Sequence, residues 1–270
     1  MPQYDAPHSR MPAEKVQELF RYAWAAFRSQ FATLALMGMG IGVLNQTIDL
    51  MPTALRIAAG FVLSPVLVLG FYRACLEALC GKKPRWGMML CGVKNLHTLG
   101  NALLMGLPAA LLDVLLILCN VGASGLYMAA AQNSNTMLLS VSVLIARVAV
   151  QLWYLYRFSL LEYTWLTGRA GSLRPAVDMT MKKTRGTLGY AVRFAIGLLL
   201  CYLPVLAVGG TAGNLIVRAG VDTTAALSAG VAVNILLDAV TPFFVMARLT
   251  FAASYFDTIK REFSSTEGLV

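Results

Sequence analysis

The feature that most constrains this chain is a series of apolar stretches, each close to 20 residues long or longer. An α-helix needs about 20 mostly apolar residues to cross the roughly 30 Å hydrocarbon layer of a bilayer. Of the 270 residues, 58% are apolar and 13% are charged, whereas soluble domains average about 45–50% and about 25%. A soluble fold of this size cannot bury so much apolar surface. We therefore predict an all-α protein that is embedded in a membrane.

Six of the apolar stretches have the length of a transmembrane helix. They cover about 31–48, 55–79, 99–119, 137–161, 188–208 and 226–250. We expect these spans to form a six-helix bundle, a single membrane domain over residues 31–256. Pro65 should break the second span, and Pro242 lies within the sixth. A polar cytoplasmic tail is expected at 257–270.

Two polar segments have the periodicity of amphipathic helices. In the N-terminal segment 1–30, apolar residues between 12 and 30 recur at steps of three and one, and basic residues occupy other positions. Residues 172–186 show a similar pattern, with Asp178 and Lys182 as an i,i+4 pair in the favourable order. We expect both helices to lie on the cytoplasmic surface of the membrane.

Small residues on the first span offer a place for helix contact. Gly38 and Gly42 are four residues apart and so lie on one face of the helix. Such a pair lets another helix approach closely in a membrane.

The distribution of positive charge orients the spans. If the N-terminus is cytoplasmic, all but three of the 22 Lys and Arg residues fall on inner loops or inner helix ends. The exceptions are Arg56, Arg147 and Arg218. Because Lys and Arg resist translocation across the membrane, this asymmetry favours two cytoplasmic termini and an even number of spans.

The net charge of +9 is compatible with two kinds of binding partner, nucleic acid and anionic lipid. The basic residues border apolar spans and alternate with Trp and Leu, which favours lipid headgroups and makes nucleic acid an unlikely partner. We predict contacts with anionic lipid from two clusters, namely Lys82, Lys83, Arg85, Lys182, Lys183 and Arg185.

The chain carries no recognised catalytic motif: G-x-S-x-G, H-E-x-x-H and the Walker A loop are all missing. The five cysteines are scattered, with no C-x-x-C and no nearby pair of histidines. We expect no enzymatic activity, no metal and no cofactor.

The most unusual residues are ionisable groups inside the spans. Arg147 lies near the centre of the fourth, Asp238 near the middle of the sixth and Asp113 in the outer half of the third. At about 1.5 Å per residue, Arg147 and Asp238 lie at nearly equal depth, with Asp113 about five residues farther out. A charge in the bilayer normally faces a partner within the bundle. The group has three interpretations: a structural ion pair, a polar site in which Arg147 binds an anion and an aspartate couples to protons or cations, or a shifted helix from which Arg147 extends outward to the interface.

Several short motifs occur in a characteristic order along the chain. They are Gly70-Phe-Tyr-Arg73, Gly81-Lys-Lys-Pro84, Tyr156-Arg-Phe-Ser-Leu-Leu-Glu-Tyr163, Ser172-Leu-Arg-Pro-Ala176, Thr180-Met-Lys-Lys-Thr-Arg-Gly186 and Ala252-Ala-Ser-Tyr255-Phe256. Their order resembles that of a bacterial family of six-span membrane proteins of unknown function, which is distantly similar to the membrane domain of some glycerophosphodiester phosphodiesterases. The resemblance implies a fold and a location but transfers no catalytic residue. The chain departs from it at Thr180 and Thr184, where the family tends to have Ser and Met.

Together these observations predict a multi-pass protein of the bacterial cytoplasmic membrane. Its expected function is that of a non-enzymatic component: a scaffold, an accessory subunit or a modulator of lipid and envelope processes. The expected partners are the bilayer and its anionic headgroups, and a second membrane protein is a further candidate. The alternative is a small transporter or permease subunit with a polar site around Arg147. A lipid-directed membrane enzyme ranks third, with Glu77, Glu162 and Asp178 as its only candidate groups.

Overall fold

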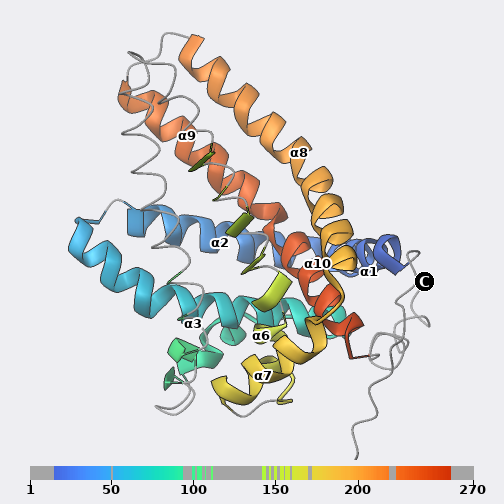
Figure 1. Cartoon of the computed structure of the whole chain (residues 1–270). Coiled ribbons are helices and arrows are strands. Elements are labelled where there is room, and N and C mark those ends of the chain that lie inside the picture. The colour runs from blue at the N-terminus through green and yellow to red at the C-terminus, as the bar shows by residue number, and fades with distance from the viewer. Residues whose placement is uncertain are drawn as a thin grey trace, which may run out of the picture.

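A computed structural model of the whole chain shows a helical protein (Figure 1). The structure describes residues 15–49, 51–93, 160–169, 172–218 and 223–256, with short helical pieces between 99 and 111 and between 142 and 158. Within this part of the chain there are helices and turns and no strand. The prediction of an all-α protein is confirmed for these residues.

The helices have the following bounds. They are α1 (Lys15–Ser29), α2 (Phe31–Asp49), α3 (Thr53–Leu79), the 3-10 helix η1 (Trp86–Val93), α6 (Leu161–Leu166), α7 (Leu173–Thr184), α8 (Leu188–Arg218), α9 (Thr223–Leu237), the 3-10 turn η2 (Asp238–Val240) and α10 (Thr241–Ser254).

Three helical stretches among the described residues are long and apolar enough to cross a membrane. They are Phe31–Ile48 in α2, Leu188–Ala212 in α8 and Ser228–Ser254 through α9, η2 and α10. They coincide with the first, fifth and sixth predicted spans. The predicted third and fourth spans lie largely outside the described residues, so the count of six stays a prediction.

The second predicted span differs from its expected form. The helix α3 runs without interruption from Thr53 to Leu79, so the break predicted at Pro65 is wrong. A proline removes one helical hydrogen bond, but a membrane helix tolerates it when neighbouring groups satisfy the freed carbonyl.

The last candidate span contains a 3-10 turn that periodicity did not predict. The helix α9 ends at Leu237, three residues form the 3-10 turn η2, and α10 begins at Thr241. Pro242 lies in the first turn of α10. Proline fits there because the first N–H groups of a helix have no partner within the helix.

The buried core lies where α1, α3, α8 and α10 meet. Leu19, Ala23 and Phe27 form the apolar face of α1 and are almost fully buried, and this face packs along α10. Phe194 of α8 stacks on Phe251 of α10, with ring centroids 4.2 Å apart. The amphipathic pattern of α1 is therefore used to pack against the protein's own helices.

The outer parts of α8 and α9 leave this core and run side by side (Figure 1). Only 12% of the Leu188–Ala212 window in α8 is buried. Its exposed side chains include Leu199, Leu200 and Leu203. A continuous apolar helix surface of this kind requires an apolar environment, which a bilayer supplies.

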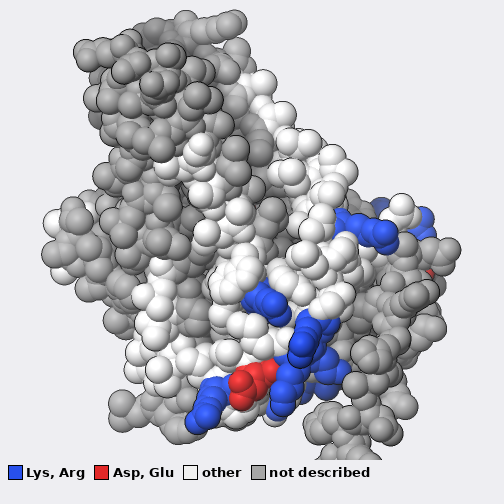
Figure 2. Space-filling view, in the orientation of Figure 1, with Lys and Arg blue, Asp and Glu red and all other residues white. Residues whose placement is uncertain are grey.

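Positive charge gathers at the opposite end, which we call the basic end. It is formed by α6, α7 and the turn between α3 and η1. Figure 2 shows Lys and Arg over α7 and the turn that follows it, and a second group at the right, where Arg193 lies exposed near the start of α8. The upper part of α8 shows neither Lys nor Arg. The molecule therefore has an apolar half and a basic end.

Candidate functional site

The break in the last span places Asp238 at the junction of two helices. Asp238 is half-buried, and its Oδ1 accepts a hydrogen bond from Thr241 Oγ1 at 3.2 Å. A short stretch of 3-10 helix within a longer helix often marks a functional hinge or local strain. A carboxylate at this position is a functional-site candidate on physical grounds.

The helix α2 comes into backbone contact with this break. A Cβ atom added at Gly38 would overlap the carbonyl oxygen of Asp238, and one added at Gly42 would overlap its Oδ2. The prediction that Gly38 and Gly42 allow close approach is confirmed. Their lack of side chains lets α2 rest on η2 and helps to fix the position of Asp238.

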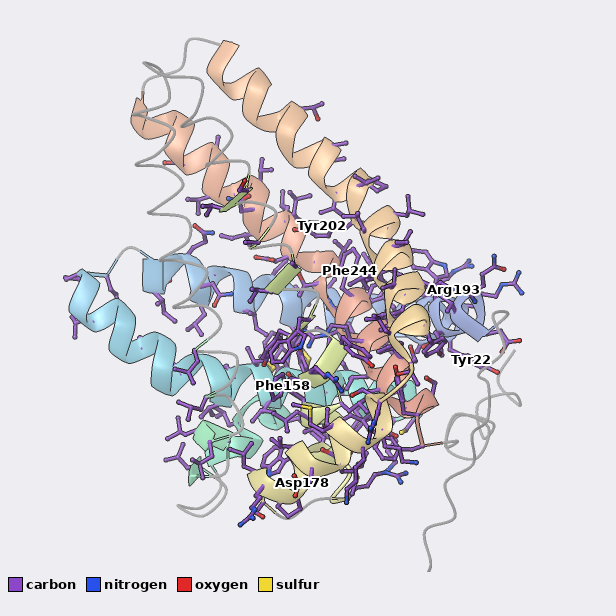
Figure 3. All side chains as sticks on the ribbon, viewed as in Figure 1. Tyr22, Phe158, Asp178, Arg193, Tyr202 and Phe244 are labelled. Atoms are coloured by element: carbon purple, nitrogen blue, oxygen red, sulfur yellow. The ribbon has the colours of Figure 1, made fainter. Side chains whose placement is uncertain are left out.

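A cavity of about 410 Å³ opens beside Asp238 between α2, α8 and the broken helix. Its polar lining groups are Gln46, Asn234, Asp238 and Thr241. Tyr202 and Phe244, labelled in Figure 3, form an edge-to-face aromatic pair with centroids 5.3 Å apart and line the apolar side. The volume falls in the range of small-ligand sites, which is about 300–1,000 Å³.

Two of the three residues predicted at the intramembrane site, Arg147 and Asp113, lie outside the described residues. Their pairing with Asp238 therefore stays a prediction. The structure adds Gln46, Asn234 and Thr241 to the candidate site. Sequence reasoning missed these residues because they carry no charge and so did not stand out, and only the fold brings the three together.

Within the described part of the chain, no three His, Cys, Asp or Glu side chains come together in a way that could hold a metal ion.

A second polar cluster lies near the basic end. Arg248 of α10 donates a hydrogen bond from Nη1 to the hydroxyl of Tyr72 at 2.7 Å, and its Nη2 lies 3.7 Å from Glu162 Oε1. Burial raises the pKa of the Glu162 carboxyl above its ordinary value, and the positive charge of Arg248 opposes that rise. Sequence reasoning did not predict this cluster, because its members come from three separate helices.

The other carboxylates considered for lipid chemistry have separate surroundings. Glu77 forms ion pairs with Arg73 at 2.8 Å and with Lys82 at 3.6 Å. Asp178 lies exposed on α7 (Figure 3). The two buried or half-buried glutamates, Glu77 and Glu162, thus each contact a cation.

The six residues predicted to contact anionic lipid are all exposed. Lys82, Lys83 and Arg85 follow α3, and Lys182, Lys183 and Arg185 lie at the end of α7 and just after it. The ammonium group of Lys183 also lies 5.4 Å from the centroid of the Phe256 ring. Their exposure leaves these charges available to a ligand or a surface.

Comparison with protein-family models, curated proteins and solved structures finds no match to this chain. The resemblance to the six-span bacterial family therefore stays a prediction. The arguments about function below depend on the geometry of the chain itself.

Proposed function

We propose that the protein is a non-enzymatic component of the bacterial cytoplasmic membrane that binds anionic lipid at its basic end. It crosses the bilayer six times and keeps both termini in the cytoplasm. One observation carries the proposal: the exposed apolar surface of α8 and the exposed cations of α7 occupy opposite ends of the molecule (Figure 2).

This separation matches the structure of a membrane leaflet. The apolar half is suited to hydrocarbon, and the basic end then lies at the level of the headgroups. Each Lys or Arg near an anionic leaflet contributes about 1 kcal/mol of attraction. Several exposed cations at one end favour an anionic leaflet over a neutral one.

The proposal is tested by measuring which lipids the purified full-length protein retains. We expect native mass spectrometry to show preferential retention of phosphatidylglycerol over phosphatidylcholine, and the preference to weaken in K182Q/K183Q/R185Q. The matched control is D178N, which changes a charge on the same helix without removing a cation. Equal retention of the two lipids by the unmodified protein would contradict the proposal.

A transporter or permease subunit is the second candidate, supported by the cavity at Asp238. The helix break, the carboxylate and three neutral polar side chains meet at one cavity within a predicted span. If this site carries ions, efflux of a monovalent cation from liposomes should depend on the protein and disappear in D238N. The variant G230A, altered in α9 away from the cavity, should retain it. If liposomes with and without the protein release the cation at the same rate, the transporter hypothesis is wrong.

A further inference from the structure

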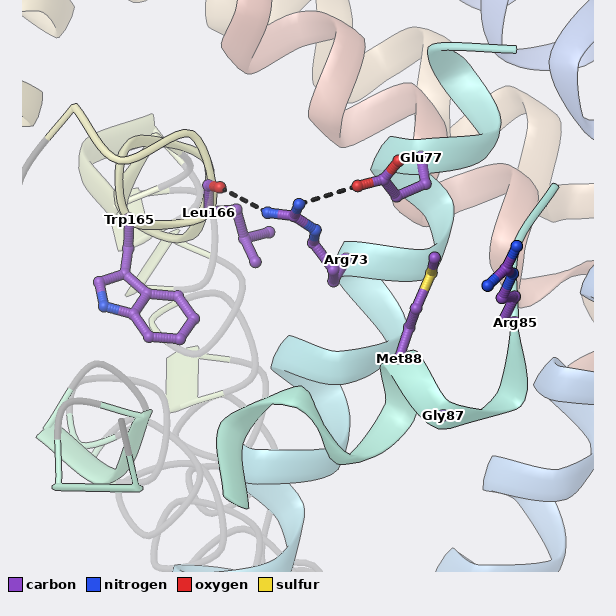
Figure 4. Close-up of a pocket in the computed structure, with 7 residues that line it drawn as sticks. All are labelled: Arg73, Glu77, Arg85, Gly87, Met88, Trp165 and Leu166. Carbon is purple, nitrogen blue, oxygen red and sulfur yellow. Dashed lines mark hydrogen bonds and ion pairs between the residues drawn. The ribbon is translucent and has the colours of Figure 1, made fainter. Parts of the chain in front are cut away.

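A separate cavity of about 450 Å³ lies at the basic end between α3, α6 and η1 (Figure 4). Its charged lining residues are Arg73, Arg85 and Glu77. Trp165 and Met88 supply apolar surface. It is distinct from the cavity at Asp238, with which it shares no lining residue.

The guanidinium of Arg73 is held in place on the wall of this cavity. Its Nη1 donates to the carbonyl oxygen of Leu166 at 3.1 Å, and its Nη2 donates to Glu77 Oε1 at 2.8 Å (Figure 4). A guanidinium has five N–H donors, so these two bonds leave others to contact a ligand. The side chain is 41% exposed, which makes the remaining donors accessible.

The cavity has an excess of positive charge. Lys82 lies 3.6 Å from the second carboxylate oxygen of Glu77, so two cations share this one negative charge. Arg85 adds a further guanidinium, and its side chain is exposed. A ligand that is attracted here is therefore an anion.

The apolar wall is also fixed by the backbone. A Cβ atom added at Gly70 of α3 would overlap the backbone of Met89, so η1 lies directly against α3. This contact holds η1, which carries Met88, against α3. Because this wall is already fixed before a ligand arrives, binding costs little conformational entropy of the protein.

We propose that this cavity binds one phosphate-bearing headgroup, with the phosphate held by the remaining N–H groups of Arg73 and attracted by the charge of Arg85. Guanidinium groups bind phosphate oxygens through paired, charge-assisted hydrogen bonds. The less polar part of the ligand then lies against Trp165 and Met88. This inference rests on the proposed binding of anionic lipid and assigns one specific site to it.

Two sources share this chemistry, a phospholipid headgroup and a soluble phosphate ester. The full-length protein in neutral detergent is titrated with phosphatidylglycerol, with glycerol 1-phosphate and with inorganic phosphate. Saturable binding of the lipid alone identifies a lipid site. If the soluble probes bind and both R73Q and R85Q weaken that binding, the cavity is a phosphate site, but its ligand is a soluble phosphate compound. No saturable binding of any of the three would overturn the inference.

Variants separate this cavity from the rest of the basic end. We expect R85Q, which changes an exposed side chain and leaves the fold intact, to weaken phosphatidylglycerol binding about tenfold, as expected for one lost charge-assisted hydrogen bond. R73Q should weaken it at least as much, and R73K should restore only part of the loss. K182Q/K183Q should leave the saturable site unchanged.

The outcomes distinguish the two proposals. If K182Q/K183Q reduces lipid retention while R73Q and R85Q bind as the unmodified protein does, this cavity is not the site and the broader proposal stands. If no variant alters retention and anionic and neutral lipids are retained equally, both proposals fail.

Discussion

The guanidinium of Arg248 joins three separate helices, since it comes from α10 and contacts Tyr72 of α3 and Glu162 of α6. Its side chain is 24% exposed and that of Glu162 is 13% exposed. A charge with so little access to water depends on its partners, because desolvation costs several kcal/mol per ion. The pair therefore fixes which helices meet at the basic end.

Removing one member of this pair should destabilise the protein more than removing both. We expect R248M to lower the free energy of unfolding by about 3–5 kcal/mol, because it leaves Glu162 buried without its cation. The double variant R248M/E162M should cost less than R248M alone. Thermal unfolding in detergent measures the difference, with R174Q, an exposed cation on α7, as the control. Additive losses in the double variant would show that the pair is not coupled.

The same carboxyl should make stability depend on pH. The pKa of Glu162 is raised in the folded protein, whereas in the unfolded chain it is about 4.3. The folded state therefore retains the proton to a higher pH, so stability from this group falls as the pH rises above about 4.3. Melting temperatures between pH 4 and pH 7 should decline less steeply for E162Q than for the unmodified protein. Parallel curves would exclude Glu162 as the source.

The helices themselves show what local patterns can predict. The expected stretches 31–48 and 172–186 correspond to α2 (Phe31–Asp49) and α7 (Leu173–Thr184), because apolar content and helical periodicity are properties of neighbouring residues. The sixth expected span differs, since it consists of α9 and α10 joined at Asp238. Hydropathy remains high across that break, so the pattern could not reveal it.

The close contact between α2 and η2 predicts that adding one methyl group at Gly42 destabilises the protein. G42A should lower the free energy of unfolding by about 1–3 kcal/mol, the usual cost of overpacking, because the added Cβ meets Asp238. G230A is the matched control, since a Cβ there meets nothing within 4 Å. Thermal unfolding in detergent compares the two variants. A G42A protein as stable as G230A would mean that α2 can shift away from η2 at no cost.

At the scale of the whole molecule, the fold brings together polar residues that are distant in sequence, and no local sequence pattern predicts these groupings. Asp238 stood out because a carboxylate inside an apolar stretch is rare. Gln46 and Asn234 did not stand out, and only the packing of α2 beside α9 and η2 brings them to its cavity. The cavity lined by Arg73 and Arg85 is a similar case, because α6 contributes Trp165 and Leu166 to it from a distant part of the chain.

The antiparallel pair formed by α8 and the α9–α10 segment predicts the sides of the membrane. We propose that each crosses the bilayer once, and the segment that joins them, 219–222, is then expected on the side opposite the end of α10. Alkaline phosphatase inserted at 219–222 should be active, and the same enzyme fused after residue 256 should be inactive. Green fluorescent protein should give the reverse result, with an N-terminal fusion as the fluorescent control. Activity of alkaline phosphatase at both positions would contradict the arrangement.

The length of α8 affects how the protein sits in a bilayer. Its apolar window, Leu188–Ala212, has 25 residues and is about 37 Å long at about 1.5 Å per residue. The hydrocarbon layer is only about 30 Å thick. If α8 crosses such a bilayer, as we propose, it must tilt or the surrounding lipid must thicken to cover it, and either adjustment costs a fraction of a kcal/mol per Å. Because the outer part of α8 lies outside the buried core and is largely exposed, we expect bilayer thickness to change the tilt of α8 and, through it, the protein to respond to lipid chain length.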